Sequence, residues 1–89
     1  MPHIRFTQNI QRYVKCAPRE VEGRTVRESL EAVFAEAPVV RGYLLDDQGA
    51  LRKHVNVFVD GLPILDRTAL SDAVEPSAQI DVMQALSGG

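Results

Sequence analysis

Two early segments of the chain alternate apolar and polar residues, with the two-residue period of a β-strand that has one buried face. They cover residues 3–8 and 12–17. Their inward positions are Ile4, Phe6, Val14 and Cys16. Since the polar turn at residues 9–11 is short, we expect the two strands to form an antiparallel hairpin, which Pro18 ends.

The next segment has the period of a helix. After a polar connection at residues 18–24, Thr25-Val26-Arg27-Glu28 fits the capping box, in which Thr25 and Glu28 satisfy each other's backbone donors. One helical face collects the apolar residues Val26, Leu30, Val33, Phe34 and Ala37. Pro38 disfavours helical geometry at the residue before it. The pattern predicts a helix that begins near Val26, stops by about Glu36 and packs one face on a sheet.

A turn and a long strand are expected after the helix. Asp46-Asp47-Gln48-Gly49 is a turn signal, and it returns the chain into a strand over residues 51–60. Val55, Val57 and Val59 share one face of this strand. Phe58 is a large apolar residue on the other, more polar face.

The last part of the chain reads as an irregular stretch and a final strand. Residues 62–77 carry no clear period, and one short helical turn is expected at 69–73. Residues 79–86 alternate again, with Ile80, Val82 and Leu86 on one face and Asp81, Met83 and Ala85 on the other. A helix between two groups of strands predicts an α+β domain.

Size and charge narrow the possible functions. The 89 residues, 45% hydrophobic and 25% charged, suit one small domain spanning residues 1–89. The formal net charge is −2 and the charges are interspersed, which argues against binding nucleic acid or anionic lipid. A single cysteine, no apolar stretch long enough to cross a bilayer, and a start that enters a strand pattern directly predict a cytoplasmic protein.

Enzymatic constellations are missing from the sequence. His3 and His54 lie on different strands without ligand spacing, so a zinc site is poorly supported. Cys16 lies in an alternating strand and has no neighbouring histidine motif, which favours a structural thiol. Asp46 and Asp47 read better as part of a turn than as metal ligands. We therefore expect no catalytic residue, no metal site and no cofactor bound by this chain.

The segment after the final strand is distinctive: Ala85-Leu86-Ser87-Gly88-Gly89. Two residues without Cβ make the narrowest and most adaptable peptide available. Such a peptide can pass through a tight channel in a partner so that its terminal carboxylate meets a reagent. A side chain at Gly88 or Gly89 would obstruct that passage.

These features together resemble a known family. The chain resembles ubiquitin-like sulfur-carrier proteins of the MoaD/ThiS family. The resemblance lies in the order of its elements, which is hairpin, helix, long strand, irregular stretch and final strand, followed by Gly88-Gly89. Further matching pieces are residues 22–26, Glu-Gly-Arg-Thr-Val, and the strand at 51–61, which looks most like the longer carriers of cysteine or thio-metabolite synthesis. The family's acidic turn before the last strand is replaced here by Pro76-Ser77-Ala78-Gln79.

The resemblance implies a fold and a mechanism. The fold is a β-grasp, a mixed sheet of four to five strands packed on one main helix, with a protruding tail at residues 86–89. The carboxylate of Gly89 would be adenylated and converted to a thiocarboxylate, while Gly88 gives reach and Leu86 or Ser87 anchors the tail. ATP and magnesium would be used by the activating partner. The chain would be a co-substrate, not an enzyme.

The same resemblance implies partners and a docking face. The partners are a ubiquitin-activating-like adenylyltransferase, a sulfur-acceptor synthase and a metalloprotease that trims the tail, and the free protein is expected to be a monomer. Phe58, Met83 and Ala85 would form the docking face, if the long strand neighbours the last one. The alternative is that Phe58 and Met83 cover a minor core beneath residues 62–77.

Two other functions share most of these features. In a ubiquitin-like protein modifier, the same activated Gly89 is joined to lysines of target proteins. In a non-covalent β-grasp interaction module, the tail is incidental. The sulfur's destination, whether cysteine, molybdopterin, thiamine or a thio-metabolite, is open, because each needs the same tail.

Overall fold

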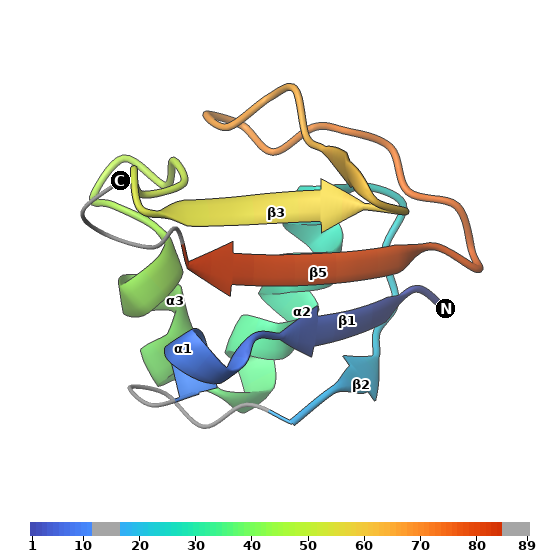
Figure 1. Ribbon diagram of the computed structural model, residues 1–89, viewed down its shortest axis with the longest axis horizontal. Helices are drawn as coiled ribbons and strands as arrows, with labels where there is room; N and C mark the ends of the chain where they lie inside the picture. The colour runs from blue at the N-terminus through green and yellow to red at the C-terminus, as the bar shows by residue number, and fades with distance from the viewer. Residues whose placement is uncertain (12–16, 85–89) are drawn as a thin grey trace.

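The computed structural model describes residues 1–11 and 17–84, and it contains a five-stranded mixed sheet with helices packed on it (Figure 1). The strands are β1 (His3–Phe6), β2 (Arg19–Glu20), β3 (Val55–Val59), β4 (Leu62–Pro63) and β5 (Gln79–Gln84). The helices are α1 (Gln8–Gln11), α2 (Val26–Glu36) and α3 (Pro38–Leu44). The α+β class and the mixed sheet predicted from the sequence are confirmed.

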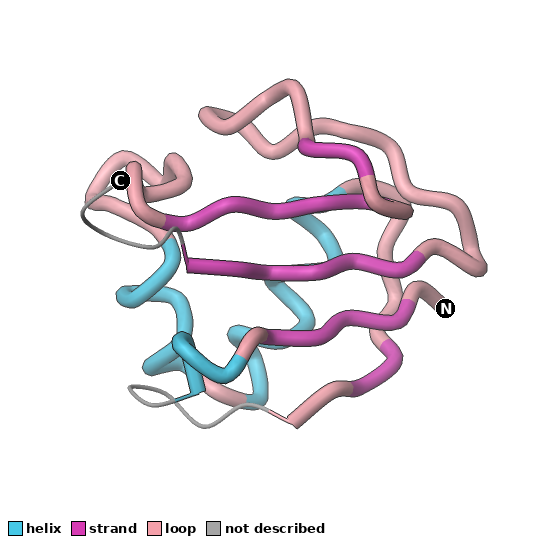
Figure 2. Tube along the Cα trace, in the orientation of Figure 1, coloured by secondary structure: helices cyan, strands magenta, loops and turns pink. Residues whose placement is uncertain are grey.

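The last strand lies at the centre of the sheet. The strand order is β2-β1-β5-β3-β4, with β5 parallel to β1 and antiparallel to β3. Pairing runs from His3↔Gln79 to Phe6↔Val82 on one side and from Val55↔Gln84 to Val59↔Ile80 on the other. Figure 2 shows these three strands side by side. The long strand and the final strand are therefore neighbours in the sheet, as expected.

The region around the first strand differs from the prediction. β1 ends at Phe6, and the expected polar turn is helix α1, in which Ile10 is fully buried. The predicted strand at 12–17 lies, apart from Ala17, outside the described residues. Within the described part, β1 pairs with β2, which lies inside the predicted connection at 18–24. A two-residue strand is too short to show a period, so the pattern could not reveal it.

Helix α2 has the predicted bounds. The Thr25 hydroxyl accepts a hydrogen bond from Glu28 N at 3.2 Å, as an N-cap should. The reciprocal bond is shifted by one residue, since the Glu28 carboxylate accepts from Arg24 N at 2.9 Å. The buried side chains of the helix are Val26, Ser29, Leu30, Val33 and Phe34.

A second helix was not predicted. The expected main helix is α2, and the shorter helix α3 follows it after the single non-helical residue Ala37. Pro38 does end α2, but it also starts α3 at a position where its missing N–H is no loss. Val40 and Leu44, four residues apart, are both fully buried. The seven-residue segment was too short for a helical period to be recognised.

The long strand is shorter than expected. β3 begins at Val55, and Leu51 makes only an isolated bridge with Leu45. Between them Val55 N donates to Arg52 O at 3.0 Å and closes a turn. At the other end, Asp60 and Gly61 have φ values of 51° and 85°, which suits the left-handed positions of a two-residue hairpin turn into β4.

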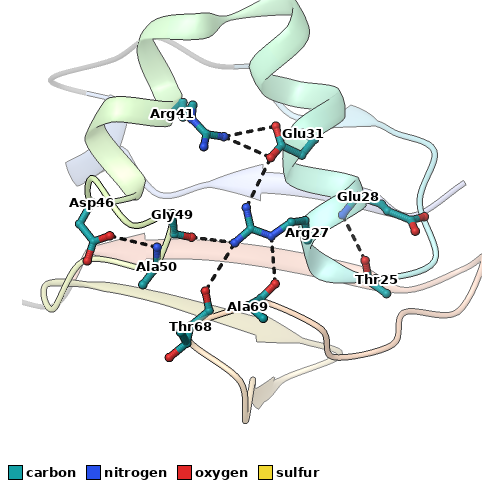
Figure 3. A network of polar contacts seen from close by, with 10 residues as sticks. All are labelled: Thr25, Arg27, Glu28, Glu31, Arg41, Asp46, Gly49, Ala50, Thr68 and Ala69. Carbon is teal, nitrogen blue, oxygen red and sulfur yellow. Dashed lines mark hydrogen bonds and ion pairs between the residues drawn. The ribbon is translucent and has the colours of Figure 1, made fainter.

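The stretch from Ile64 to Ala78 is irregular but anchored. No helix forms at 69–73; instead a turn at residues 67–69 is capped by Asp66, and the chain then runs extended along the start of α2. Val26 N and Arg27 N, which have no partner inside the helix, donate to Asp72 O and Leu70 O. Figure 3 shows Arg27 reaching on to Ala69 O and Gly49 O.

The core lies between one face of the sheet and α2. The inward strand residues Ile4, Phe6, Val55, Val57, Ile80 and Val82 are all buried. They belong to the same cluster as the buried side chains of α2. Alternation along β1, β3 and β5 therefore leaves the opposite face of the sheet available for other contacts. In the described residues, no helix is long and apolar enough to cross a membrane.

Candidate functional site

The candidate site lies where β5 ends. Gln84, the last described residue, pairs with Val55 at the beginning of β3. The five following residues carry the predicted adenylation site Gly89, the tail residues Gly88, Ser87 and Leu86, and the docking residue Ala85. All five lie outside the described residues, so these assignments stay predictions. What the structure defines is the surface from which the segment continues.

Phe58 and Met83 lie on the same outer face of the sheet. Asn56 pairs with Met83 and Phe58 pairs with Asp81, which makes Phe58 and Met83 diagonal neighbours on adjacent strands. Diagonal side chains are within reach of each other when they are long or aromatic. Met83 is 36% exposed and Phe58 is partly buried. Neither belongs to the buried core cluster of the described residues, and the docking face and the alternative of a minor core beneath residues 62–77 both stay predictions.

Charged groups border this apolar pair on two sides. On β1 and β5, Arg5 Nε donates to Asp81 Oδ1 at 2.8 Å, and this bond and the Asp81 charge raise the pKa of Arg5. From the 66–70 turn, Arg67 donates to Asn56 Oδ1 at 3.2 Å and to Val55 O at 2.8 Å. None of the ion pairs among the described residues includes Arg67. Its positive charge is therefore held beside β3 without a carboxylate partner.

Helix α3 contacts the end of β5. The Tyr43 hydroxyl donates to Gln84 Oε1 at 2.6 Å. The Tyr43 ring also stands edge to face against His54, with 5.9 Å between ring centroids. This links the last described residue of β5 to α3 and to the turn before β3. The segment 85–89 thus starts from a strand end that is tied to two other elements.

The other residues considered from the sequence do not gather into a site. His54 is exposed and contacts Tyr43, whereas His3 lies on β1. Asp46 accepts from Gln48 N and Ala50 N, so it caps the predicted turn. Among residues 1–11 and 17–84, no group of three His, Cys, Asp or Glu side chains could hold a metal ion. Cys16 lies outside these residues.

Sequence reasoning missed Arg67, Tyr43 and Gln84. Arg67 and Tyr43 lie outside the predicted strands, and they reach β3 and β5 only through the packing of the 66–70 turn and of α3. Gln84 sat inside the predicted strand at 79–86. A glutamine at the end of an alternating run is a weak signal for a polar contact. Nothing in the sequence indicated that the partner of Gln84 would be Tyr43.

Comparisons with known proteins place the fold. No protein-family model and no curated protein sequence matches the chain. Among solved structures, SAMP1 from Haloferax volcanii has a TM-score of 0.77 at 21% identity, covering 99% of this chain and 98% of that one. CysO in the Amycolatopsis orientalis BexX/CysO complex has a TM-score of 0.83 at 17% identity, with complete coverage of both chains. CysO from Mycobacterium tuberculosis has a TM-score of 0.81 at 15% identity and covers 97% of this chain and 100% of that one.

These likenesses run over nearly the whole length of both partners. They agree with the central parallel pairing of β1 and β5 and with α2 crossing one face of the sheet. The resemblance that the sequence indicated is confirmed at the level of architecture. This chain has the ubiquitin-like β-grasp fold that SAMP1 and CysO share.

Proposed function

We propose that this protein is a ubiquitin-like carrier whose Gly89 carboxylate is activated and converted to a thiocarboxylate for sulfur transfer. The observation that carries the proposal is the position of the Gly-Gly sequence. It follows β5, the central strand of a β-grasp sheet, after only Ala85, Leu86 and Ser87. A rigid sheet can therefore present a narrow segment to a partner.

The chemistry needs two steps, one at the carboxylate oxygen of Gly89 and one at its carbonyl carbon. A carboxylate oxygen of Gly89 attacks the α-phosphorus of ATP, which releases pyrophosphate and leaves an acyl-adenylate. A hydrosulfide ion then attacks the carbonyl carbon, AMP leaves with the bonding electron pair, and the new S–H group loses its proton to water. The product is a thiocarboxylate, whose sulfur is a soft nucleophile held by a folded carrier. ATP and Mg²⁺ are bound by the activating partner, in the cytoplasm.

The chain's own surface has the task of docking. Phe58 and Met83 offer apolar contact area, and Arg67, which hydrogen-bonds to the neighbouring Asn56, offers a positive charge that has no ion-pair partner among residues 1–11 and 17–84. Central apolar residues with a polar surround are typical of protein interfaces. CysO, which has the same fold, was crystallised in a complex with BexX, and this supports a carrier that works with a protein partner. The acceptor synthase and a trimming metalloprotease would be further partners.

The decisive experiment is intact mass spectrometry of the protein purified from its native host. We expect a fraction whose mass exceeds that of the free carboxylate form by the exchange of one oxygen for sulfur. A Gly88→Leu variant should lose this species, because the side chain obstructs the narrow segment. Gly42→Ala is the matched control, since a Cβ at Gly42 meets nothing within 4 Å. Equal thiocarboxylate in both variants would contradict the proposal.

A second candidate function is supported by a specific comparison. The Methanosarcina acetivorans structure that matches this chain with a TM-score of 0.79 is a small archaeal modifier protein. A modifier would use the same adenylate but join Gly89 to lysine side chains of other proteins. Tryptic peptides from host extract that carry residues 68–89 of this chain joined to a lysine side chain would favour this function over the sulfur carrier, because Arg67 is the last basic residue before Gly89.

A further inference from the structure

An apolar hollow lies at the sheet edge formed by β4 and the segment after it. It has a volume of about 540 Å³, and its wall includes Val59, Leu62, Pro63 and Leu65. Leu62 is 71% exposed and Leu65 is 93% exposed. Two leucines this exposed within four residues of a small protein are unusual unless something covers them.

This edge lies at the other end of β3 from the point where segment 85–89 continues, although Phe58 of the outer sheet face pairs with Pro63 of the hollow. The hollow begins at Val59, whereas segment 85–89 continues from Gln84, which pairs with Val55. Val59 is four residue steps along the strand from Val55, a distance of roughly 13 Å at about 3.3 Å per residue. Figure 1 shows β4 and the following loop beyond β3, at the edge of the sheet. A molecule in the hollow would therefore leave the end of β5 accessible.

The backbone at this edge is poorly suited to accept another strand. β4 has only two residues, and one of them, Pro63, has no N–H to donate. The next donor, Ile64 N, already bonds to Val57 O at 3.1 Å. A short edge strand with proline is a usual protection against edge-to-edge pairing. Contacts here must therefore be made by side chains.

Two carboxylates border the hollow and lack a positive partner. Asp60 Oδ1 accepts from Gln79 N at 2.9 Å, and the two oxygens of Asp72 accept from Asp66 N and Leu65 N at 2.8 and 3.0 Å. Neither aspartate takes part in an ion pair with the described residues. Because each carboxylate oxygen can accept more than one hydrogen bond, both retain capacity for a cationic side chain.

We propose that this hollow is a second docking surface, which takes a segment of a partner protein with apolar side chains next to lysine or arginine. The apolar side chains would bury Leu62 and Leu65, and the basic groups would pair with Asp60 and Asp72. A partner segment can occupy this surface while another protein binds the end of β5. The proposal does not depend on the chemistry of Gly89.

An NMR titration tests this on the full chain labelled with nitrogen-15. The probes are two synthetic amphipathic helical peptides of equal length, with leucines on one face and either lysines or glutamates on the other. We expect the lysine peptide to cause saturable shifts of the Leu62, Ile64 and Leu65 amides. The glutamate peptide should bind at least about tenfold more weakly, because like charges meet at Asp60 and Asp72.

Three variants separate this surface from the outer sheet face. The double variant Leu62→Ser, Leu65→Ser should lower the affinity for the lysine peptide at least about tenfold, since two leucines lose their burial. Both leucines are exposed, so the fold should be kept. Asp60→Asn keeps the turn and the bond to Gln79 N but removes a charge, and it should weaken binding several-fold. Met83→Ala should leave the affinity unchanged, because Met83 pairs with Asn56 and does not line the hollow.

Three results would overturn the proposal. The first is shifts centred on Phe58 and Met83, or none that saturate. The second is equal affinity for the two peptides. The third is sedimentation showing that the protein self-associates and that the double serine variant stays monomeric, because a second copy of the chain would then be the occupant.

Discussion

Single residues carry out several tasks that a pattern of apolar positions does not describe. Gly23 allows the chain to approach α2 closely, since a Cβ there would lie 2.6 Å from Ser29 Oγ and 2.7 Å from Ser29 N. Ser29 is itself fully buried. Asp66 organises a turn by accepting from Ala69 N at 2.9 Å and from Ser71 Oγ at 2.5 Å. Each task leads to a measurable prediction.

Replacing Gly23 by alanine should destabilise the protein by about 1–3 kcal/mol, the usual cost of forcing extra atoms into a packed region. The backbone of Ser29 has no room to retreat, because it belongs to α2. Urea unfolding measures the change. Gly42→Ala is the control and should cost nothing, because its Cβ meets open space and alanine favours the helix. Similar stabilities for the two variants would show that the contact at Gly23 relaxes freely.

The turn capped by Asp66 should weaken in acid. Hydrogen bonds, first from the Ser71 hydroxyl and then from the Ala69 amide, lower the pKa of Asp66 from 3.8 to about 2. A carboxyl whose pKa is lower in the folded protein stabilises it above the unfolded pKa, and this contribution is lost as the pH falls from about 4 through about 2. The free energy of unfolding of the wild type should therefore decrease over that window.

The matching variants test the source of that decrease. Asp66→Asn should show a smaller decrease, because it lacks the titrating group. Asp47→Asn should behave like the wild type, since Asp47 makes no hydrogen bond or ion pair with the described residues. Parallel pH profiles for wild type and Asp66→Asn would exclude Asp66 as the cause.

At the scale of elements, α2 organises the irregular segments around it. Its free N-terminal amides hold residues 70–72, and the side chain of Arg27 holds two turns at once. Arg27 donates to Gly49 O at 2.7 Å and to Ala69 O at 2.9 Å (Figure 3). The guanidinium suits this role because its donors point in several fixed directions. The stretch 64–78 is thus ordered without regular structure.

Arg27→Ala should destabilise the protein by about 1–2 kcal/mol, because carbonyls of two turns lose a charged donor. Arg41→Ala is the matched control. Arg41 also binds Glu31, at 3.1 Å, but this pair is exposed and should contribute less than about 1 kcal/mol. Chemical denaturation compares the two. Hydrogen exchange at Gly49 and Ala69 should rise in Arg27→Ala only, and equal exchange in both variants would contradict the anchoring role.

At the scale of the whole molecule, two surfaces lie next to β3, and Phe58 of one pairs with Pro63 of the other. One is the outer face with Phe58 and Met83, toward the end of β5, and the other is the hollow beside Leu62 and Leu65. The core lies on the other face of the sheet, against α2. Changes in either surface should therefore affect contacts with other proteins more than stability.

Phe58→Ala should weaken binding of the activating partner at least about tenfold, as expected for a central aromatic contact, and leave the melting temperature nearly unchanged. ATP–pyrophosphate exchange with the partner from the same host measures the effect. Leu62→Ala should leave this exchange unaltered, because the pairing of β3 and β4 places Leu62 on the opposite face of the sheet from Phe58. A large fall in melting temperature for Phe58→Ala, like the 2–5 kcal/mol typical of core truncations such as Leu30→Ala, would instead assign Phe58 to the core.

The predictions that were confirmed rest on local signals. Thr25 and Pro38 mark the ends of α2 because capping and the restriction before proline act within one turn of chain. The alternation around Ile80 and Val82 identifies β5 because the strand is half buried. The candidate docking pair, Phe58 and Met83, could be named for the same reason, since the register of alternation places both on the outer face.

The sequence by itself thus determined the central strands, the main helix and the Gly-Gly segment after β5. Only the tertiary structure decided that Arg19–Glu20 pairs with β1, that residues 38–44 form a helix, and that Arg67 and Tyr43 reach the ends of β3 and β5. These features depend on contacts between residues far apart in the chain. Their energy comes from completing the sheet and the core, and no short stretch of sequence carries that information.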